Sequence, residues 1–488
     1  MAIMNRSCRE TLPWRAGVFV GALALVGGAV PALAEDAAKI DSGDTAWMLT
    51  SSALVLMMTA PGLALFYGGL VRGKNALSVL MQSFIMMALI SVQWVLWGYT
   101  LAFGPDHGHV IGGLDWLGLR HVGLTPNPDY APTIPHQTYM IYQAMFAIIT
   151  PALITGAFAE RMKFSAFVVF SLLWATLVYD PLAHMVWGTG GLVGKVWGAL
   201  DFAGGTVVHI SSGMSALVCA VVIGKRLGFG RESMPPHNLP FTVTGAALLW
   251  VGWFGFNAGS AVAANGLATS AFVATNTATV AAALSWMTAE WVGKGKPTVL
   301  GAASGAVAGL VAITPASGFV EPMPALIIGA VAGVLCYSAC NLKSALGWYD
   351  DALDVVGVHG VGGTWGAIAT GLWATARINP DVFAPKGPAV SEGLFISGHW
   401  GLLGYQLLAI LVTYSLAIVG SLVCLAITSA VTGGLRATED DEFAGLDLSQ
   451  HGESAYAFGA GGYGPIGQSA FAARPVERHG TLAAKVAE

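Results

Sequence analysis

An apolar segment at residues 203–224 contains the run Gly204-Gly-Thr-Val-Val-His-Ile-Ser-Ser-Gly213, so His209 lies inside a stretch long enough to cross a bilayer. A second such segment contains Val355-Val-Gly-Val-His-Gly-Val-Gly-Gly363, and therefore His359. An ionisable side chain within a membrane span is costly and by default marks a transport path. The alternative is a core histidine that hydrogen-bonds to a backbone carbonyl. Two histidines in matching segments favour the transport path.

The composition is that of an integral membrane protein. Hydrophobic residues make up 55% of the 488 residues, charged residues make up only 10%, and the mean hydropathy is +0.66. These values exclude a soluble globular domain. The 64 glycines suit helices that pack closely within a membrane. A net charge of −5 is too weak to indicate a nucleic-acid partner.

The N-terminus has the pattern of a signal peptide. A basic start with Arg6, Arg9 and Arg15 precedes an apolar run, and Pro31-Ala-Leu-Ala34 then offers a cleavage site. An uncleaved anchor helix is the alternative, although the run is short for a membrane span. We therefore assign residues 1–34 to a signal peptide. Its cleavage would leave the mature N-terminus outside the cytoplasm.

The sequence contains little that would serve a cofactor or an enzyme. It has five cysteines, at positions 8, 219, 336, 340 and 424, and their distribution gives no disulfide framework. Histidine and cysteine do not cluster in a way that would complete a metal site. We expect no metal and no other cofactor. We also expect no enzyme activity, because no nucleophile–base arrangement or phosphate-binding loop stands out.

Eleven apolar segments after the signal peptide have spanning length, which predicts an all-α integral membrane fold. They lie near residues 46–71, 76–103, 137–159, 163–184, 203–224, 239–258, 268–292, 298–314, 323–341, 355–375 and 401–431. With the mature N-terminus outside, the cytoplasmic loops carry ten Lys and Arg residues and the outer loops five. This excess predicts an N-out, C-in topology, which an odd number of spans also requires.

The odd number of spans suggests five helices, an inverted copy of those five, and one added helix. His209 lies in the fifth segment and His359 in the tenth, which are matching positions. Inverted repeats place a substrate path at their interface near the middle of the membrane. We therefore expect both side chains to face one central path. The transmembrane domain would cover residues 35–431, and residues 432–488 would form a cytoplasmic tail.

Six runs of the sequence resemble signature motifs of the ammonium transporter (Amt/Mep/Rh) family. They are Pro61-Gly-Leu-Ala-Leu-Phe-Tyr-Gly-Gly-Leu-Val-Arg-Gly-Lys-Asn75, His184-Met-Val-Trp-Gly188, Asp201-Phe-Ala-Gly-Gly-Thr-Val-Val-His209, Gly252-Trp-Phe-Gly-Phe-Asn-Ala-Gly-Ser260, Asp350-Asp-Ala-Leu-Asp-Val-Val-Gly-Val-His-Gly360 and Gly445-Leu-Asp-Leu-Ser-Gln-His-Gly-Glu453. The resemblance extends in order over roughly residues 45–457. It is closer to the bacterial and plant Amt branch than to Rhesus proteins, because Trp187 and Ser260 are Amt-like.

The resemblance implies a homotrimer in which each subunit encloses its own narrow apolar pore. By the same resemblance, Trp187 and Ser260 form an outer ammonium site, and Phe146 closes its floor. Phe146 and Phe256 are then the two stacked rings that block the pore entrance. Tyr142 lies one helical turn before Phe146, at a position where other members can carry Phe. Without the resemblance, Trp187 fits an interfacial aromatic belt, and the two Phe residues fit an apolar core.

The resemblance makes His209 and His359 the pore pair and makes Asp201 an essential acid near the outer vestibule. Asp201 lies at the first turn of the fifth predicted helix. An acid there caps the helix by accepting N–H bonds at the positive end of the helix dipole. We therefore expect Asp201 to act through the position of the helix and not as a ligand.

The sequence thus predicts a multi-pass ammonium transporter of the inner (plasma) membrane. It would recruit ammonium, or its analogue methylammonium, deprotonate it, and conduct ammonia with or without the proton. An ammonium sensor that signals through a cytoplasmic partner and a Rhesus-type gas channel are the alternatives.

The tail contains a segment with a possible regulatory function. Residues 445–456 resemble the family's cytoplasmic regulatory element, which packs beneath neighbouring subunits and can engage a PII-type signal protein. Ser449 occupies a position where plant relatives carry a phosphorylated Thr, although an unmodified helix cap is the simpler interpretation. Residues beyond about 460 have the composition of a disordered segment.

Overall fold

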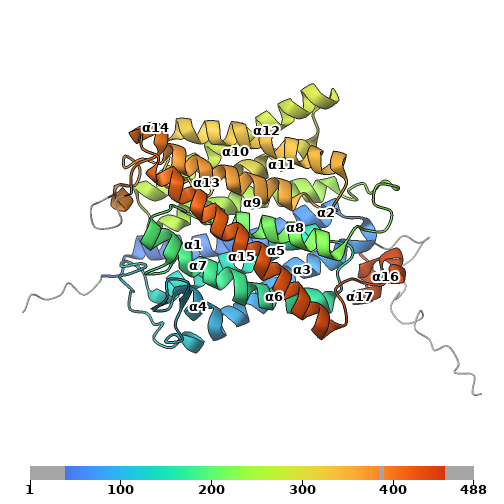
Figure 1. The fold of residues 1–488 in the computed structure, drawn as a ribbon, viewed down its shortest axis with the longest axis horizontal. Helices are drawn as coiled ribbons and strands as arrows, with labels where there is room; N and C mark the ends of the chain where they lie inside the picture. The colour runs from blue at the N-terminus through green and yellow to red at the C-terminus, as the bar shows by residue number, and fades with distance from the viewer. Residues whose placement is uncertain (1–38, 384–389, 457–488) are drawn as a thin grey trace, which may run out of the picture.

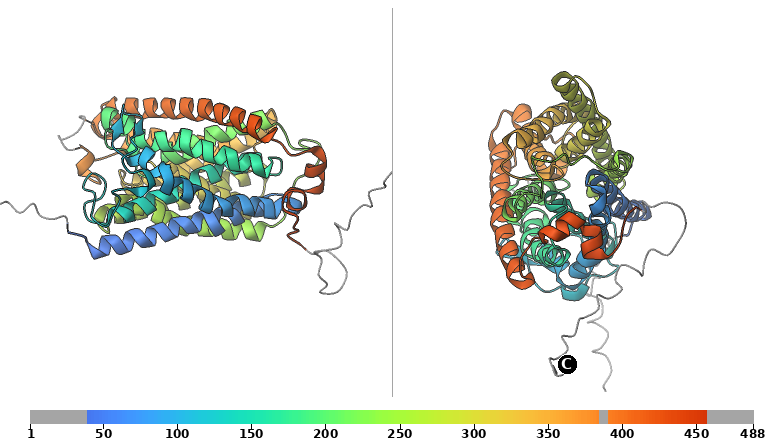
Figure 2. Two further views of the ribbon diagram at one scale, coloured as in Figure 1. Left: turned by 90° about the horizontal axis from the view of Figure 1, so that it is seen from below. Right: turned by 90° about the vertical axis from the view of Figure 1, so that its right-hand side faces the viewer.

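The computed structural model describes residues 39–383 and 390–456. The predicted signal peptide at residues 1–34 and the end of the tail beyond residue 456 lie outside these ranges. Long helices run in a common direction, and the connecting segments gather at the two ends of the bundle (Figure 2). The last long helix, α15 (Gly401–Thr432), crosses the outside of the bundle diagonally (Figure 1).

Nine helical segments of the described residues are long and apolar enough to cross a membrane. They are Ser42–Leu70, Gly73–Phe103, His136–Phe158, Phe164–Trp197, Gly205–Ile223, Leu239–Ala261, Gly266–Lys294, Pro322–Leu346 and Gly401–Thr432. This finding confirms the expected helical membrane fold. Two further expected spans correspond to shorter helices at Val299–Ile313 and Val356–Trp373, so the number eleven stays a prediction.

The chain divides into two halves of helices. The α labels are those of Figure 1, and η denotes a π- or 3-10 turn. The first half contains α1 (Ser42–Met57), η1 (Met58–Leu63), α2 (Ala64–Leu70), η2 (Gly73–Asn75), α3 (Ala76–Gln93), η3 (Trp94–Gly98), α4 (Tyr99–Phe103), η4 (Leu117–Leu119), α5 (His136–Phe158), α6 (Phe164–Trp174), η5 (Ala175–Tyr179), α7 (Asp180–Trp187), η6 (Leu192–Trp197), η7 (Gly205–Ile210) and α8 (Ser211–Ile223). The second half contains α9 (Leu239–Ala258), η8 (Gly259–Ala261), α10 (Gly266–Lys294), α11 (Val299–Ile313), α12 (Pro322–Leu346), η9 (Val356–Gly360), α13 (Val361–Trp373), η10 (Pro380–Phe383), α14 (Leu394–Ser397), α15 (Gly401–Thr432), α16 (Glu439–Ala444) and α17 (Leu446–His451). A short antiparallel hairpin, β1 (Asp106–His107) with β2 (Ile111–Gly112), lies in the connection between α4 and α5.

The two histidine segments are built alike. His209 lies in the π-helical turn η7, which continues into the 13-residue helix α8. His359 lies in the π-helical turn η9, which continues into the 13-residue helix α13. Wide π turns are uncommon inside helices and are frequent at functional sites. This correspondence between the halves supports the inverted repeat expected from the sequence.

Each histidine turn is capped by an aspartate eight residues earlier in the chain. Asp201 accepts hydrogen bonds from the N–H groups of Gly204 at 2.8 Å, Gly205 at 2.7 Å and Thr206 at 2.7 Å, and also from the Thr206 hydroxyl. Asp351 accepts the N–H of Val356 at 2.8 Å. The first N–H groups of a helix have no partner within the helix, so these carboxylates stabilise the start of both turns.

A glycine contact lets the two histidine segments approach each other. A Cβ atom on Gly213 of α8 would lie 2.3 Å from the backbone nitrogen of Gly360 in η9. A Cβ atom on Gly363 of α13 would lie 2.9 Å from the Cβ atom of His209. Side chains at these positions would therefore force the segments apart. The central helix α5, nearly all of whose residues are buried, packs against α8 on the other side.

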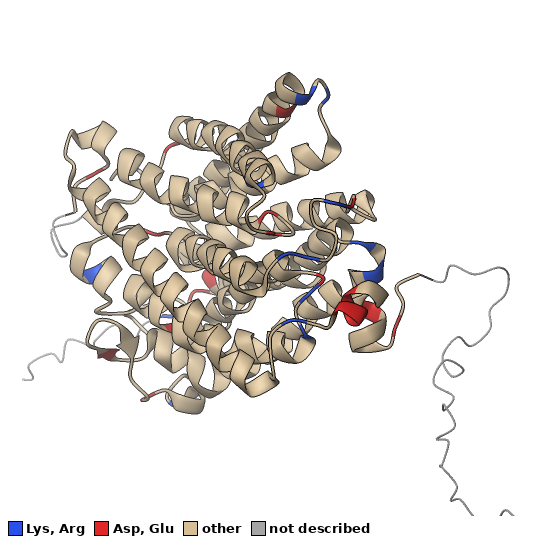
Figure 3. Cartoon of the chain, turned by 45° about the vertical axis from the view of Figure 1, so that its right-hand side comes forward, with Lys and Arg blue, Asp and Glu red and all other residues tan. Residues whose placement is uncertain are grey.

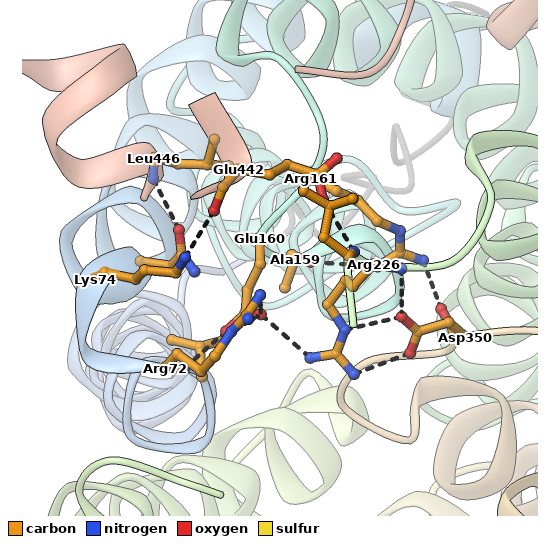
Figure 4. Close-up of polar contacts among 12 residues, drawn as sticks. Arg72, Lys74, Ala159, Glu160, Arg161, Arg226, Asp350, Glu442 and Leu446 are labelled. Carbon is orange, nitrogen blue, oxygen red and sulfur yellow. Dashed lines mark hydrogen bonds and ion pairs between the residues drawn. The ribbon is translucent and has the colours of Figure 1, made fainter. Parts of the chain in front are cut away.

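Most of the basic residues lie at the end of the bundle that carries α16 (Figure 3). There Glu160 pairs with Arg72 at 2.7 Å and with Arg226 at 3.4 Å, and Arg226 pairs in turn with Asp350 at 2.8 Å (Figure 4). Burial by itself would raise the pKa of Asp350, but the hydrogen bonds and charge of Arg226 outweigh it and lower this pKa. The network ties the loop that precedes η9 to the loops of the first half.

The C-terminal segment docks on the start of α3 within the same chain. Lys74 donates to the carbonyls of Glu442 at 2.8 Å and Phe443 at 2.7 Å (Figure 4). Asp447 accepts the N–H groups of Leu77 at 3.0 Å and Ser78 at 2.7 Å, so a side chain of the tail caps a membrane helix. The part of the tail in α16 and α17 is therefore an integral part of this end of the bundle.

We expect Asp201→Ala to lower stability by about 2 kcal/mol or more, because several donors at the start of η7 lose their acceptor together. Asp41→Ala is the matched control, since Asp41 is an exposed cap of α1 whose side chain accepts only the Asp44 N–H, at 2.9 Å. The thermal unfolding midpoint of the purified protein in detergent measures the effect. Equal shifts for the two variants would contradict the special role of Asp201.

Candidate functional site

An open vestibule of about 580 Å³ lies at the end of the bundle opposite α16. Its lining includes Phe146 of α5, Trp187 of α7, Ser260 of η8, and Asp201 just before η7. These residues come from four separate parts of the chain. The structure therefore brings together all the residues expected at the outer site.

Trp187 is held in this vestibule by its indole N–H. The indole nitrogen donates to the backbone carbonyl of Asp201 at 2.9 Å. The carboxylate of the same aspartate caps η7, so one residue connects the tryptophan to the turn of His209. The ring of Trp187 stands nearly perpendicular to Phe146, with centroids 6.0 Å apart and an interplanar angle of 83°. The half-buried indole can thus offer aromatic surface to a molecule in the vestibule.

Ser260 presents an acceptor to the same space. Its hydroxyl donates to the carbonyl of Phe256 at 2.9 Å, so its hydrogen is engaged and its lone pairs stay available. The buried hydroxyl of Tyr142 lies 3.2 Å from Ser260 and donates to the same carbonyl at 2.8 Å. Tyr142 therefore anchors the serine and the start of the pore together, a contact that a Phe at this position could not make.

Two stacked phenyl rings close the floor of the vestibule. The centroids of Phe146 and Phe256 lie 4.2 Å apart, and the planes make an angle of 29°. Each side chain is only 1% exposed. The stacked rings lie between the vestibule, which Phe146 lines, and the next cavity, which Phe256 lines.

Two small cavities continue the path below the rings. The first, about 10 Å³, is lined by Phe256, His209 and His359 among mainly apolar side chains. This volume is near the lower limit for holding one water-sized molecule. The second, about 60 Å³, extends from His359 to Asp354. The vestibule, the rings, the histidines and the inner cavity therefore follow one another in a line.

The two histidines contact each other directly. Their Nδ1 atoms are 3.2 Å apart, and both side chains are buried. The ring of His209 also stacks on Trp253 of α9, with centroids 5.4 Å apart and an angle of 25°. The expectation that both imidazoles face one central path matches this geometry.

Thr314, just after α11, determines which nitrogen of each neutral histidine carries hydrogen. Its hydroxyl donates to the Leu310 carbonyl at 2.8 Å and accepts the indole N–H of Trp253 at 2.9 Å. Towards the Nε2 atom of His209, 3.3 Å away, it can therefore only accept. Neutral His209 then carries its hydrogen on Nε2, and the hydrogen between the two Nδ1 atoms belongs to His359. His359 keeps an unprotonated Nε2.

Sequence reasoning missed three residues that shape this site. Asp351 could have been found, because it precedes His359 by the same eight residues that separate Asp201 from His209. Trp253 lies inside one of the signature motifs, but nothing in the motif shows that it stacks on a histidine. Thr314 had no local signal, since its contacts depend only on how α11 packs beside α9 and η7.

The described residues contain no group of three or more His, Cys, Asp or Glu side chains that could hold a metal ion. Four cysteines in this part of the chain are free and buried, so they form no disulfide with one another. The polar groups discussed above in the candidate site are hydroxyls, imidazoles, an indole and carboxylates, set among aromatic and aliphatic side chains.

Comparisons with known proteins match the part of the chain that contains the candidate site. The model of the Ammonium Transporter Family matches residues 46–456. The ammonium transporter of Bacillus subtilis (strain 168) is 53% identical over 415 residues, which cover 85% of this chain and 98% of that relative. Ammonium transporter Amt1 of Archaeoglobus fulgidus is 46% identical over 419 residues, which cover 86% of this chain and 100% of that relative.

Solved structures with a similar fold are described as Mep or Amt proteins. The crystal structure of Saccharomyces cerevisiae Mep2 superimposes with a TM-score of 0.76 and 37% identity, covering 82% of this chain and 89% of that one. A structure described as a sensor Amt protein gives a TM-score of 0.75 and 26% identity, covering 84% and 98%. The relatives are named as transporters, which confirms that the chain is not an enzyme. From the family match and these identities, the chain belongs to the ammonium transporter family.

Proposed function

We propose that this protein transports ammonium by capturing the cation in the vestibule and passing ammonia between the histidines. The observation that carries the proposal is the linear order of an open aromatic vestibule, two stacked rings, a cavity for one small molecule, and a second cavity at the opposite end. Family membership supports ammonium as the substrate, and methylammonium as its analogue.

Capture requires a site that attracts a small cation and accepts its hydrogen bonds. The indole of Trp187 attracts a cation through the face of its ring, by about 0.5–2 kcal/mol depending on desolvation. Potassium would gain as much from the ring, so the selectivity comes from acceptors. The lone pairs of Ser260 are such acceptors and favour ammonium, which can donate N–H bonds.

Free-energy magnitudes favour ammonia as the species inside the pore. Moving an intact ion of this size into a dry, apolar space costs on the order of 20 kcal/mol in the idealised limit. Removing the proton near neutral pH costs about 1.4 kcal/mol for each unit between the pKa and the pH, which amounts to only a few kcal/mol for ammonium. Moving neutral ammonia into the same space costs roughly 2–7 kcal/mol, as for any unpaired polar group. The cost is lower when a histidine hydrogen-bonds to the ammonia.

The histidine pair then lowers the remaining barrier. The unprotonated Nε2 of His359 can accept an N–H bond from ammonia, and the Nε2–H of His209 belongs to the bond with Thr314. The hydrogen bond between the two Nδ1 atoms also offers a route along which a proton can pass separately from ammonia. The ammonium-dependent current of the reconstituted protein would show whether the proton crosses together with ammonia.

We further propose eleven spans in the inner (plasma) membrane, with the N-terminus outside and the tail inside, and a homotrimeric assembly. Three points support this topology. The helices α11 and η9–α13 run within the bundle beside longer spans. Most basic residues lie at the α16 end (Figure 3). The docked tail places a regulatory segment at the proposed cytoplasmic face, where a PII-type signal protein is the proposed partner.

Cysteine labelling tests this orientation. Gly123 and Ser233 are exposed at opposite ends of the bundle, and a Cβ atom on Gly123 meets no neighbour within 4 Å. We expect an impermeant thiol reagent added to whole cells to label Gly123→Cys and not Ser233→Cys. The parent protein is the control, because its described cysteines are buried. The reverse labelling pattern would overturn the proposed topology.

Replacing the vestibule tryptophan tests cation capture. We expect Trp187→Leu to raise the half-saturating ammonium concentration by about 2- to 30-fold, because the cation loses its ring partner. Currents from reconstituted protein on a solid-supported membrane measure this concentration. Trp400→Leu is the control, since Trp400 is 71% exposed at the same end of the bundle. An unchanged concentration dependence in Trp187→Leu would leave Trp187 as an interfacial belt residue.

Replacing the histidines tests the pore. We expect His209→Asp to pass ammonium or methylammonium but to admit potassium, because a carboxylate draws in water and stabilises a cation. The double variant His209→Ala with His359→Ala should lose transport, whereas His399→Ala, an exposed control, should not. Liposome currents with ammonium and potassium, and growth of an ammonium-uptake-deficient host, provide the measurements. Normal, selective flux in the double variant would show that the two histidines serve only to pack the core. A folded parent protein that binds ammonium but carries no flux would favour the sensor alternative.

A further inference from the structure

A pair formed by a buried histidine and a half-buried aspartate lies at the foot of the segment that carries Trp187. His184 of α7 is fully buried, and its Nε2 atom lies 2.9 Å from Oδ1 of Asp106 in β1. Its Nδ1 atom lies 3.1 Å from the carbonyl oxygen of Ala102. A carbonyl can only accept, so Nδ1 carries a hydrogen, and a second proton is shared between Nε2 and the carboxyl group.

The carboxyl group of this pair is held in its ionised form by a second histidine. Asp106 accepts the backbone N–H of His109 at 2.9 Å, and its other oxygen lies 3.3 Å from the Nδ1 atom of His109. Desolvation alone would raise the pKa of Asp106, but the hydrogen bonds from His184 and His109 lower it. Asp106 therefore bonds both to the His184 ring and to the backbone N–H of His109, and these contacts fix its position beside α7.

The pair supports the turn that follows Trp187. His109 donates from Nδ1 to the carbonyl of Gly190 at 2.6 Å. A Cβ atom on Gly190, whose φ is +88°, would lie 3.0 Å from the Cβ atom of Asp106. A Cβ atom on Gly188 would lie 2.6 Å from Nδ1 of His184. Glycines at these positions thus let the turn pack directly on the pair, with no space between them.

We propose that Asp106 and His184 are positioning residues that fix the ring of Trp187 in the outer ammonium site. This inference rests on the proposed function. Trp187 is the last residue of α7 and lies between His184, three residues before it, and the supported turn after it. Attraction of a cation by a ring requires the cation to lie within about 6 Å over the ring face. A shift of this turn would carry the ring away from Ser260 and weaken capture without touching the histidines of the pore.

A purely structural pair would have different consequences. It would lower the amount of folded protein and the maximal current, and its effect would be independent of the residue at position 187. A positioning pair changes the half-saturating concentration and has nothing to position once the indole is absent. Sites that act through one another are non-additive, and this non-additivity separates the two interpretations.

The experiment measures ammonium-dependent currents of the full-length protein in liposomes on a solid-supported membrane. Asp106→Asn and His184→Gln each remove one member of the pair, and each is made both alone and in the Trp187→Leu background. Asp115→Asn is the control, because Asp115 is an exposed acid of the same outer connection. His109→Ala provides a milder variant, since the His109 side chain is 53% exposed and its replacement removes only the support of Gly190 and Asp106.

We expect Asp106→Asn and His184→Gln to raise the half-saturating concentration about three- to tenfold with the maximal current retained, and His109→Ala to raise it about twofold. Asp106→Asn combined with His184→Gln should raise the half-saturating concentration no more than either single variant does. None of them should raise the concentration further in the Trp187→Leu background. An unchanged concentration, or a full additional rise in that background, overturns the inference. If Trp187→Leu alone has no effect, the proposed outer site fails instead, so the two failures are distinguishable.

Discussion

The structure depends on keeping water away from the short segment between the phenyl rings and the histidine pair. The cavity there is about 10 Å³, and its walls are mostly aromatic and aliphatic side chains. In such a space a charge costs on the order of 20 kcal/mol in the idealised limit, whereas a small neutral molecule with one hydrogen-bond partner costs far less. The stacked pair Phe146–Phe256 and the neutral, mutually bonded histidines both serve this constraint, because each replaces water by a protein group.

The same constraint explains why two polar turns must meet so closely. Each histidine lies in a π-helical turn whose first N–H groups are satisfied by an aspartate, Asp201 in one half and Asp351 in the other. The capping carboxylates lie towards opposite ends of the bundle and outside the dry segment, so no carboxylate is needed inside it. The contact between Gly213 and Gly360 then allows the two imidazoles to reach hydrogen-bond distance. Asp201 also holds the indole of Trp187 through its carbonyl, which joins the outer site and the pore in one rigid unit.

Several charged side chains at the two ends of the bundle have partners within the protein. At the tail end, Glu160 and Asp350 are neutralised by arginines, and the tail itself caps α3 through Asp447. At the vestibule end, Asp106 and His184 contact each other beside the turn of Trp187, with Nε2 of the histidine 2.9 Å from the carboxylate. Truncating one member of such a pair leaves a buried charge without a partner, which costs more than the pair contributed. These end networks therefore help to hold the helices in register at both ends of the bundle.

The sequence by itself determined the membrane class and most of the spans, because apolar length is a local signal. It also singled out His209 and His359, because an ionisable residue inside an apolar segment is a local signal too. It also placed Asp201 as a cap, since an acid at a helix start has a local physical reason. Only the tertiary structure decided that Thr314 and Trp253 orient His209, that Tyr142 anchors Ser260, and that Asp106 pairs with His184. These contacts join residues that are 61 to 118 positions apart in the chain. Local periodicity carries no record of which faces of distant helices meet, so the partners of a side chain appear only when the helices are packed.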